Sequence, residues 1–399
     1  MKSAHILPME RWKFFCYTTL AFFLSPVFFL VTRLRRRHPQ ETPKILVVPI
    51  LTRVGDLICA TPVFRAIKIA KPKAHLSVLV GKKIIDLIVS NPRIDTIINL
   101  NDIPYKGFFG RGRLFFRLFS EHFDDVILLT NNPFNNLLAF FSMASLRVKT
   151  VILDRSFAER LTDWMSNRRV IYTPGTFLQD HYIRLLSNIG ISFSPPVKEV
   201  FPTKEGERKA EQFFSENGVS SGSFLVGICP SAGNSAKEWP AARFSELADL
   251  IATRYKAKIV FIDSPGNLSR VEEVITGMKQ KDAALPPAVH FSLSEVPSVV
   301  KKLSVFIAVD TGLIYVAHAL QVPLLDIIGP FHPKEQAPDD RRSIQVRPPK
   351  EIEPSLFILT KPREFSLQRQ AVLSVPVSDV FEAFEELLNR GIISSPLGI

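Results

Sequence analysis

The sequence predicts an α/β protein built from two doubly wound domains, each a parallel sheet with helices on both faces. Continuous apolar runs of strand length alternate along the chain with segments whose apolar residues recur at helical spacing. Such alternation is typical of parallel strands joined by right-handed crossovers. The chain has 399 residues. That length exceeds one ordinary core and suits two domains of roughly 200 residues each.

The composition indicates a folded chain with anionic partners. Hydrophobic residues make up 46% of the sequence and charged residues 22%, which argues against disorder. The net charge of +12 favours nucleic acid, phosphorylated ligands or an anionic membrane surface as partners. No nucleic-acid-binding motif is present. Cys16, Cys59 and Cys229 lie far apart in apolar surroundings. They indicate neither a disulfide framework nor a metal cluster, and they fit a reducing compartment.

Residues 14–32 form an uncharged stretch about as long as a helix that spans a bilayer core. The stretch lacks a small-residue cleavage site and ends in the basic cluster 33–37, so residues 1–43 are predicted to be a retained anchor and linker. The arginines behind the stretch place the bulk of the chain on the cytoplasmic face of the inner membrane. Pro26 leaves a kinked, monotopic helix open as an alternative to a spanning one.

The first domain is predicted over residues 44–190 and starts with a continuous apolar run, residues 45–51, typical of a buried parallel strand. A short turn follows, and apolar residues then recur at helical spacing from Leu57. This places Asp56 at the helix N-cap, at the carboxyl end of the first strand, where open α/β sheets bind ligands. Taken alone, Asp56 is as well explained by helix capping as by a role in a site. Further strands are expected at 76–80, 95–100 and 125–130, and helices at 82–90, 135–145 and 179–189.

One segment of this domain, residues 106–117, interleaves aromatic and basic side chains. An exposed helix that packs through its phenylalanines is the favoured interpretation, and a surface for an anionic lipid or a nucleic acid is the alternative.

The second domain is predicted over residues 203–345, after a proline-rich linker at 191–202. Residues 346–399 form a C-terminal extension with a final helix over 378–390. Two doubly wound domains that face each other leave a cleft between the carboxyl ends of their strands. The second domain is expected to contain strands at 223–229, 257–262, 305–309 and 322–328, and helices at 241–255, 296–303 and 313–320.

Two loops of the second domain carry groups that suit a diphosphate. Lys237 lies in the loop after strand 223–229, and Asp310, Thr311 and Gly312 open a helix after strand 305–309. A flexible ammonium and the free N–H groups of a helix N-terminus both bind phosphate. Taken singly, each loop is better explained by a solvated lysine or a capping aspartate. Together with Asp56 they predict a site.

Three segments resemble the motifs of glycosyltransferase family 9, the ADP-heptose:lipopolysaccharide heptosyltransferases: KILVVPILTRVGDLICATPVFRAIK, KEWP and VDTGLIYVAHALQVPLLDIIGP. The resemblance covers residues 44–340 and implies a GT-B fold, whose N-terminal Rossmann-like domain binds the acceptor and whose C-terminal one binds the nucleotide-sugar. It implies that Asp56 is the catalytic base and Lys237 the phosphate-binding lysine. It also implies that Asp310, Thr311 and Gly312 form the donor-binding turn. Ser231 stands where the family often has a hydroxyl that contacts phosphate.

The sequence departs from the family pattern at two places. Tyr315, counted here among the donor-binding residues, stands where the family commonly has a histidine, and the nearby His318 is expected to pack within its helix. The family's glutamate for the nucleotide is missing after strand 257–262, where Asp263 or Asn267 is a substitute. These departures bear on the sugar or the base more than on the reaction.

The resemblance implies an inverting glycosyltransferase that moves a sugar, a heptose in the family, from an ADP-sugar to a lipid-linked saccharide such as the lipopolysaccharide core. We expect no cofactor and no metal, because no acidic pair of the DxD type lies on a loop. The expected partners are the donor, the lipid-linked acceptor and the membrane surface, without nucleic acid. A nicotinamide oxidoreductase is disfavoured, because G-x-G-x-x-G is missing after strand 45–51. A catalytically inactive, membrane-tethered protein that binds a nucleotide-sugar or glycolipid is the alternative.

Overall fold

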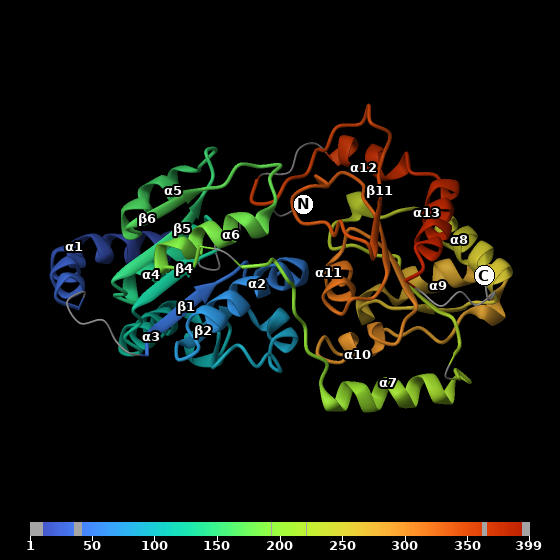
Figure 1. Ribbon diagram of the computed structural model, residues 1–399. Helices are drawn as coiled ribbons and strands as arrows, with labels where there is room; N and C mark the ends of the chain where they lie inside the picture. Colours follow the sequence, from blue (N-terminus) through green and yellow to red (C-terminus); the bar gives the residue numbers. More distant parts are fainter. Residues whose placement is uncertain (1–10, 36–41, 193, 221, 361–364, 393–399) are drawn as a thin grey trace. The chain divides into compact units, whose positions relative to one another are not determined.

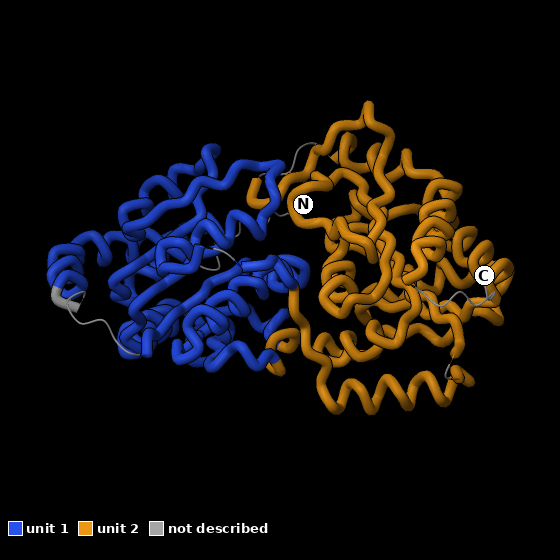
Figure 2. The backbone as a smooth tube through the Cα atoms, in the orientation of Figure 1, with its two compact units in different colours: residues 1–85, 91–197 blue, residues 86–90, 198–399 orange. Residues whose placement is uncertain are grey.

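The computed structural model describes residues 11–35, 42–192, 194–220, 222–360 and 365–392. Parts of four predicted segments lie outside these ranges: residues 1–10 and 36–41 of the anchor and basic linker, residue 193 of the interdomain linker, residue 221 of the second domain, and residues 361–364 and 393–399 of the extension. The chain forms two compact units (Figure 2). Unit 1 comprises residues 1–85 and 91–197, and unit 2 comprises residues 86–90 and 198–399.

Unit 1 contains a six-stranded parallel sheet in the order β3-β2-β1-β4-β5-β6 (Figure 1). The central strand β1 pairs in parallel with both β2 and β4, as its unbroken apolar sequence predicted. The sequence pattern did not predict β5 and β6, because Arg and Lys residues interrupt their apolar runs. The strands are β1 (Lys44–Val48), β2 (His75–Val80), β3 (Thr96–Asn99), β4 (Asp125–Leu128), β5 (Leu146–Val151) and β6 (Arg168–Ile171).

Helices cover both faces of this sheet. On one face Leu46 and Val48 of β1 pack with α3 (Gly107–Ser120) and α4 (Pro133–Phe141), and α1 (Arg11–Arg35) packs on α4. Alternate residues of a strand point to the opposite face, where α2 (Val54–Ala70) and α6 (Leu178–Leu186) pack against each other. Shorter helical elements complete the unit: η1 (Lys82–Leu87), η2 (Ile103–Tyr105), α5 (Phe157–Leu161), η3 (Asp163–Met165) and η4 (Ser187–Ile189).

Two segments of unit 1 that were predicted to be helical, 82–90 and 106–117, correspond to the helices η1 and α3. The segment expected to be a helix at 82–90 forms η1, a 3-10 helix that ends at Leu87 and is therefore shorter than predicted. The aromatic and basic segment 106–117 forms the helix α3, which buries Leu114 and Phe115 and leaves Phe109 and Phe116 exposed, 82% and 69%. Among the described residues one helix, the stretch Arg11–Arg33 within α1, is by length and composition alone able to cross a membrane.

Unit 2 contains a five-stranded parallel sheet in the order β11-β10-β9-β7-β8. Four of its strands were predicted: β7 (Leu225–Cys229), β8 (Lys258–Phe261), β9 (Val305–Val309) and β10 (Leu324–Ile327). The fifth, β11 (Ser343–Val346), was not, because it is short and alternates polar with apolar residues. Two parallel sheets with helices confirm the predicted α/β class.

Helices of unit 2 include two that the apolar spacing predicted closely, α8 and α11. The final helix α13 packs on α8, where the rings of Tyr255 and Phe384 lie 5.5 Å apart between centroids. The helices are α7 (Lys204–Glu216), α8 (Ala241–Tyr255), α9 (Leu268–Gly277), α10 (Val296–Val300), α11 (Gly312–Ala319), α12 (Phe365–Leu373) and α13 (Val377–Asn389), and the 3-10 turns are η5 (Ser235–Lys237), η6 (Pro265–Asn267) and η7 (Lys281–Ala283).

Candidate functional site

The candidate phosphate-binding residues of unit 2 lie after two neighbouring strands. Strands β7 and β9 pair in parallel along their length. Lys237 ends the 3-10 turn η5 in the loop after β7, and Asp310 follows β9 directly. Because the carboxyl ends of parallel strands share one edge of a sheet, the two loops meet there.

Lys237 and Asp310 form a largely buried ion pair. The ammonium Nζ lies 2.5 Å from Asp310 Oδ2 and also donates to the backbone oxygen of Asp310 at 3.1 Å. The Asp310 side chain is 4% exposed and that of Lys237 18%. The Tyr315 hydroxyl donates to the other carboxylate oxygen, Oδ1, at 2.9 Å. Asp310 therefore orients Lys237 and is itself held by Tyr315, so residues from two predicted motifs meet.

The start of helix α11 lies beside the ammonium of Lys237. Thr311 is the N-cap of this helix and has an extended backbone, and Gly312 is the first helical residue. The first N–H groups of an α-helix have no partner within the helix and carry the positive end of its dipole. Lys237 Nζ contacts the backbone oxygen of the residue just before the N-cap. An ammonium and a helix N-terminus side by side suit a bound diphosphate.

A second carboxylate, Asp326 of β10, lies near this ion pair and was not predicted. It is fully buried, and neither carboxylate oxygen has a hydrogen-bond partner among the described residues. Burial, and after it the negative charge of Asp310, raise the pKa of Asp326 well above its usual range, whereas Lys237 lowers it. Asp326 is therefore stabilised as the neutral acid. An aspartate within the apolar run VPLLDIIG was the sequence signal for it, because aspartate is rarely buried without a reason.

Ser231 lies two residues beyond the end of β7 and is 3% exposed. In the part of the chain that the structure describes, its hydroxyl has no hydrogen-bond partner. A buried hydroxyl without a partner is costly unless a ligand or water satisfies it. Its position fits the phosphate contact that the family resemblance implies.

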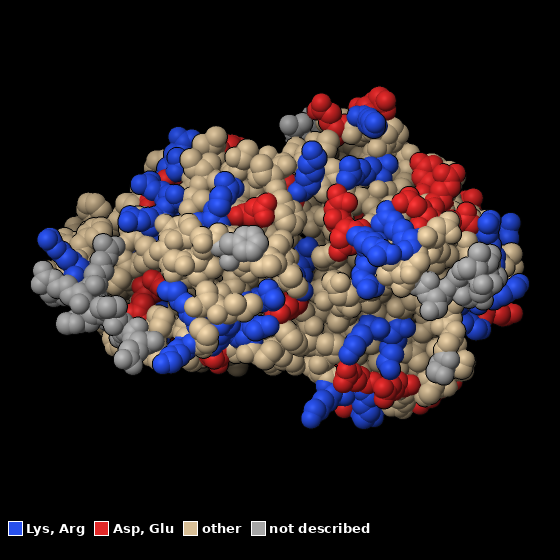
Figure 3. All heavy atoms as spheres, in the orientation of Figure 1, with Lys and Arg blue, Asp and Glu red and all other residues tan. Residues whose placement is uncertain are grey.

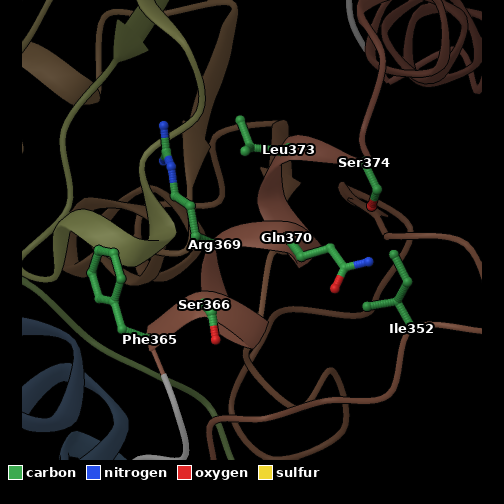
Figure 4. A pocket seen from close by; sticks show the side chains of 7 residues that line it. All are labelled: Ile352, Phe365, Ser366, Arg369, Gln370, Leu373 and Ser374. Atoms are coloured by element: carbon green, nitrogen blue, oxygen red, sulfur yellow. The ribbon is translucent and has the colours of Figure 1, made fainter.

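Helix α12, which the sequence pattern did not predict, supports the loop that carries Lys237. Arg369 donates to the backbone oxygen of Glu238, and Gln368 accepts a hydrogen bond from Asn234 at 3.2 Å. Figure 4 shows Arg369 pointing toward this loop, away from Gln370. The pocket beside α12 includes none of the predicted site residues and is lined by Ile352, Phe365, Ser366, Arg369, Gln370, Leu373 and Ser374 (Figure 4).

Three further residues weighed from the sequence, His318, Asp263 and Asn267, have partners inside unit 2. His318 Nε2 lies 2.9 Å from Asp340 Oδ2, and burial lowers the pKa of the His318 imidazole. His318 therefore packs at the end of α11, as expected. Asp263 Oδ1 accepts hydrogen bonds from the Asn267 side chain at 2.6 Å and the Ser264 backbone at 2.7 Å. These bonds shape the loop after β8, and a role of Asp263 or Asn267 toward a nucleotide stays a prediction.

In unit 1, Asp56 lies within the first turn of α2, so the prediction that it is the N-cap was wrong. The N-cap is Arg53, and the hydrogen bond from Leu57 N to Arg53 O, 3.1 Å long, closes the first turn. Val54 is already helical, so the helix starts three residues before Leu57, where the apolar spacing indicated its start. Asp56 is 4% exposed and forms an ion pair with the Arg53 guanidinium. A carboxylate in the first turn also interacts favourably with the helix dipole.

Asp56 also lies close to helix α6. Burial, and after it the negative charge of Asp56, raise the pKa of the Tyr182 phenol well above its usual range. Tyr182 is therefore a neutral neighbour of this carboxylate. Asp56 follows β1 and lies at the start of α2, and its role as a base stays a prediction.

Several known proteins that this chain resembles are described as heptosyltransferases. The chain is 22% identical over 307 residues to the lipopolysaccharide core heptosyltransferase OpsX of Haemophilus influenzae, with 75% of this chain and 82% of that protein covered. A crystal structure of a family 9 glycosyltransferase from Veillonella parvula superposes with a TM-score of 0.73 and 21% identity, covering 88% of this chain and 98% of that one. For E. coli heptosyltransferase WaaC with ADP-2-deoxy-2-fluoro heptose the TM-score is 0.61 and the identity 16%, with 86% and 99% covered.

These solved structures share the fold of this chain, which confirms the GT-B architecture expected from the motifs. The family assignment rests on a broader match. The model of glycosyltransferase family 9 (heptosyltransferase) matches residues 111–358, more than half of the sequence. Both the resemblance in the motifs and the prediction of an enzyme are thereby confirmed, and the chain belongs to glycosyltransferase family 9.

Proposed function

We propose that the protein transfers a heptose from ADP-heptose to a lipid-linked saccharide such as the lipopolysaccharide core, with inversion at the anomeric carbon. The relative from Haemophilus influenzae is named for lipopolysaccharide core synthesis, and the E. coli enzyme was solved with an ADP-heptose analogue. The observation that carries the proposal is the Lys237–Asp310 ion pair beside the N-terminus of α11. We place the reaction at the cytoplasmic face of the inner membrane, which suits a lipid-linked acceptor.

In the proposed reaction Asp56 accepts the proton of the acceptor hydroxyl while that oxygen attacks the anomeric carbon. The new glycosidic bond forms as the bond from the anomeric carbon to the diphosphate oxygen breaks, and its electron pair leaves with ADP. Inversion follows from attack opposite the leaving group. Asp56 is held in place by its ion pair with the Arg53 guanidinium.

The leaving diphosphate is stabilised by groups of unit 2. Lys237 and the first N–H groups of α11 hold the charge that builds up on the diphosphate oxygens. Asp310 and Tyr315 orient Lys237 through the contacts described above. The Ser231 hydroxyl donates a hydrogen bond to a phosphate oxygen. The proposed reaction uses no metal ion.

The test is a transfer assay with the purified full chain, ADP-heptose and a lipid-linked acceptor that lacks the heptose. Transfer from ADP-heptose, with ADP-glucose and UDP-glucose far poorer donors, supports the proposal. The anomeric configuration of the transferred sugar is read by NMR, and retention of the donor configuration would overturn the inverting mechanism. Binding of ADP-heptose without any transfer to the acceptor would favour the inactive binding protein instead.

A further inference from the structure

One face of helix α1 is buried against unit 1 along nearly the whole helix. The Tyr17 hydroxyl donates to the backbone oxygen of Phe108 in α3 at 2.6 Å, and the Phe28 ring stacks on Phe140 of α4 at 4.2 Å between centroids. Residues three, four or seven apart share one face of a helix. The buried residues of α1 have this spacing: Phe14, Tyr17, Thr18, Ala21, Phe28 and Thr32.

Helix α1 completes the core of unit 1 and does not stand apart from it. The guanidinium of Arg147, a β5 residue that is 1% exposed, lies over the Phe28 ring at 4.6 Å. Phe14, Tyr17, Ala21 and Phe28 belong to the same apolar cluster as β1 and α4. The buried residues run from Phe14 to Thr32, about 27 Å along the helix axis. That distance is close to the roughly 30 Å of a bilayer core. A spanning α1 would therefore draw its packing partners, the buried Arg147 included, into the membrane.

The opposite face of α1 is exposed and apolar. Phe23 is 72% exposed and Leu30 61%, and Cys16 lies on the same side seven residues before Phe23. Trp12 and Val27 extend this face. Contiguous exposed apolar surface of this kind marks a binding surface, and an interfacial membrane helix has this pattern.

Helix α3 continues the apolar face. Trp12 of α1 stacks on Phe108 at 5.5 Å, and Phe108 contacts the exposed Phe109 at 5.5 Å. Phe109, Arg113 and Phe116 then form one exposed stripe along α3. The two helices are thus joined into one surface by a row of aromatic rings.

The charge of this surface selects its partner. The sequence of α1 contains four basic residues and that of α3 three, and neither contains an acidic residue. Figure 3 shows basic groups on the described part of unit 1 near α1, beside uncharged surface. Exposed aromatic rings among basic side chains suit the interface of a bilayer with anionic headgroups.

We propose that α1 and α3 form one membrane-facing surface, and that α1 lies along an anionic bilayer surface instead of crossing it. This inference rests on the membrane location in the proposed function and not on the transfer reaction. It favours the monotopic helix, the alternative that Pro26 left open. A second copy of the chain is the competing occupant of this surface.

The first experiment measures the depth of three sites on the outward face of α1. The full chain, bound to vesicles of phosphatidylethanolamine and phosphatidylglycerol, is labelled at native Cys16, or at F23C or L30C in a C16S background. Cys59 and Cys229 are buried and stay unlabelled in the folded protein. Lipids that quench at known depths then report the position of each label. Equal depths near the headgroups are expected. Depths that differ by about 20 Å between Cys16 and position 30 would show a spanning helix and overturn the proposal.

The second experiment tests whether α3 shares the surface. The F109S/F116S variant is expected to bind these vesicles on the order of tenfold more weakly. The matched control is I69S, since Ile69 is 54% exposed but belongs to α2, which covers the opposite face of the sheet. Unchanged binding of F109S/F116S overturns the composite surface. A dimer that cross-links through Cys16 and persists in the presence of vesicles would also overturn it, because a second copy would then cover this surface.

A third arm separates this inference from the proposed function. Transfer to a soluble acceptor analogue is measured for F109S/F116S and for the parent. Unchanged turnover together with lost vesicle binding is expected. If neither the parent nor F109S/F116S showed turnover, the proposed reaction would be contradicted, but the vesicle-binding result would still hold.

Discussion

Replacing Lys237 by methionine removes the ammonium while keeping most of the side-chain volume. The variant leaves Asp310, whose side chain is 4% exposed, with the Tyr315 hydroxyl but without a cation, and near the buried Asp326. Breaking a buried ion pair from one side costs about 3–5 kcal/mol. Because the Lys237 side chain is 18% exposed, water screens part of this cost, and we expect about 3 kcal/mol in the free energy of unfolding.

The functional effect is separated from this stability effect by comparing two ligands. ADP carries the diphosphate and adenosine does not, so K237M should weaken ADP binding and leave adenosine binding unchanged. The transfer rate should also fall, because further negative charge develops on the diphosphate as the glycosidic bond breaks. We expect a total loss on the order of 2–4 kcal/mol, measured by titration calorimetry and by steady-state kinetics.

A matched control is K301M, which removes an exposed lysine that lies 3.4 Å from Glu207 in unit 2. It should change neither ligand affinity by more than a small factor. A double variant, K237M/D310N, should recover part of the lost stability, because the unpaired carboxylate is then gone. Parent-like ADP binding by K237M, or an equal loss for adenosine, would refute contact between this ammonium and the diphosphate.

Four other perturbations have defined outcomes. Asp56→Asn should lower turnover by about 10²–10⁴-fold in the transfer assay while leaving ADP binding nearly intact, because it removes the proton acceptor but leaves the phosphate-binding groups of unit 2 unchanged. Phe28→Ala should cost about 3–5 kcal/mol in denaturant unfolding, whereas Phe29→Ala, whose side chain is 49% exposed, should cost far less. Burial lowers the pKa of His181 from 6.5 to about 3. Below about pH 6.5 the unfolded chain therefore binds a proton that the folded chain does not, and stability should fall by about 1.4 kcal/mol per pH unit down to about pH 3, a slope that H181Q lacks. A chelator should leave transfer intact, because the proposed phosphate contacts need no metal ion.

Each of these expectations has a contrary result. Near-normal turnover of D56N would remove Asp56 as the base. Equal costs for the two phenylalanine variants would mean that α1 does not pack as described. The same pH slope in H181Q and the parent would assign it to another group. Activity lost with chelator and restored by magnesium would overturn the roles given to Lys237 and the start of α11.

The central strands of both sheets were predictable because they are buried on both faces and read as unbroken apolar runs. Strand β5 escaped prediction because it carries Arg147 and Lys149, both fully or almost fully buried. Arg147 donates to the Met165 backbone at 2.8 Å, and Lys149 pairs with Asp163 at 2.5 Å. Such partners are brought close only by the tertiary structure, so the local sequence pattern does not predict that these charged residues are buried.

The residues of the candidate site also fall into a group that could be predicted from local sequence and a group that could not. Lys237, Asp310 and Tyr315 were found because they belong to short motifs that follow predicted strands, and the structure brings them within hydrogen-bond distance. Asp326 and α12 were missed because their relation to these residues depends on strand order and on a distant segment. Arg369 contacts the Lys237 loop across more than a hundred residues of sequence.

Tyr315 shows how a departure from the family pattern fits the site. It stands where the family commonly has a histidine, and its hydroxyl donates to Asp310 Oδ1, while Lys237 takes Oδ2. Both oxygens of Asp310 are therefore occupied, and the carboxylate holds the ammonium in one orientation. A phenol remains neutral through the physiological range, whereas an imidazole titrates near neutral pH. The tyrosine thus fixes Asp310 without adding a charge to a buried cluster that already contains Asp326, so this departure bears on how Lys237 is oriented.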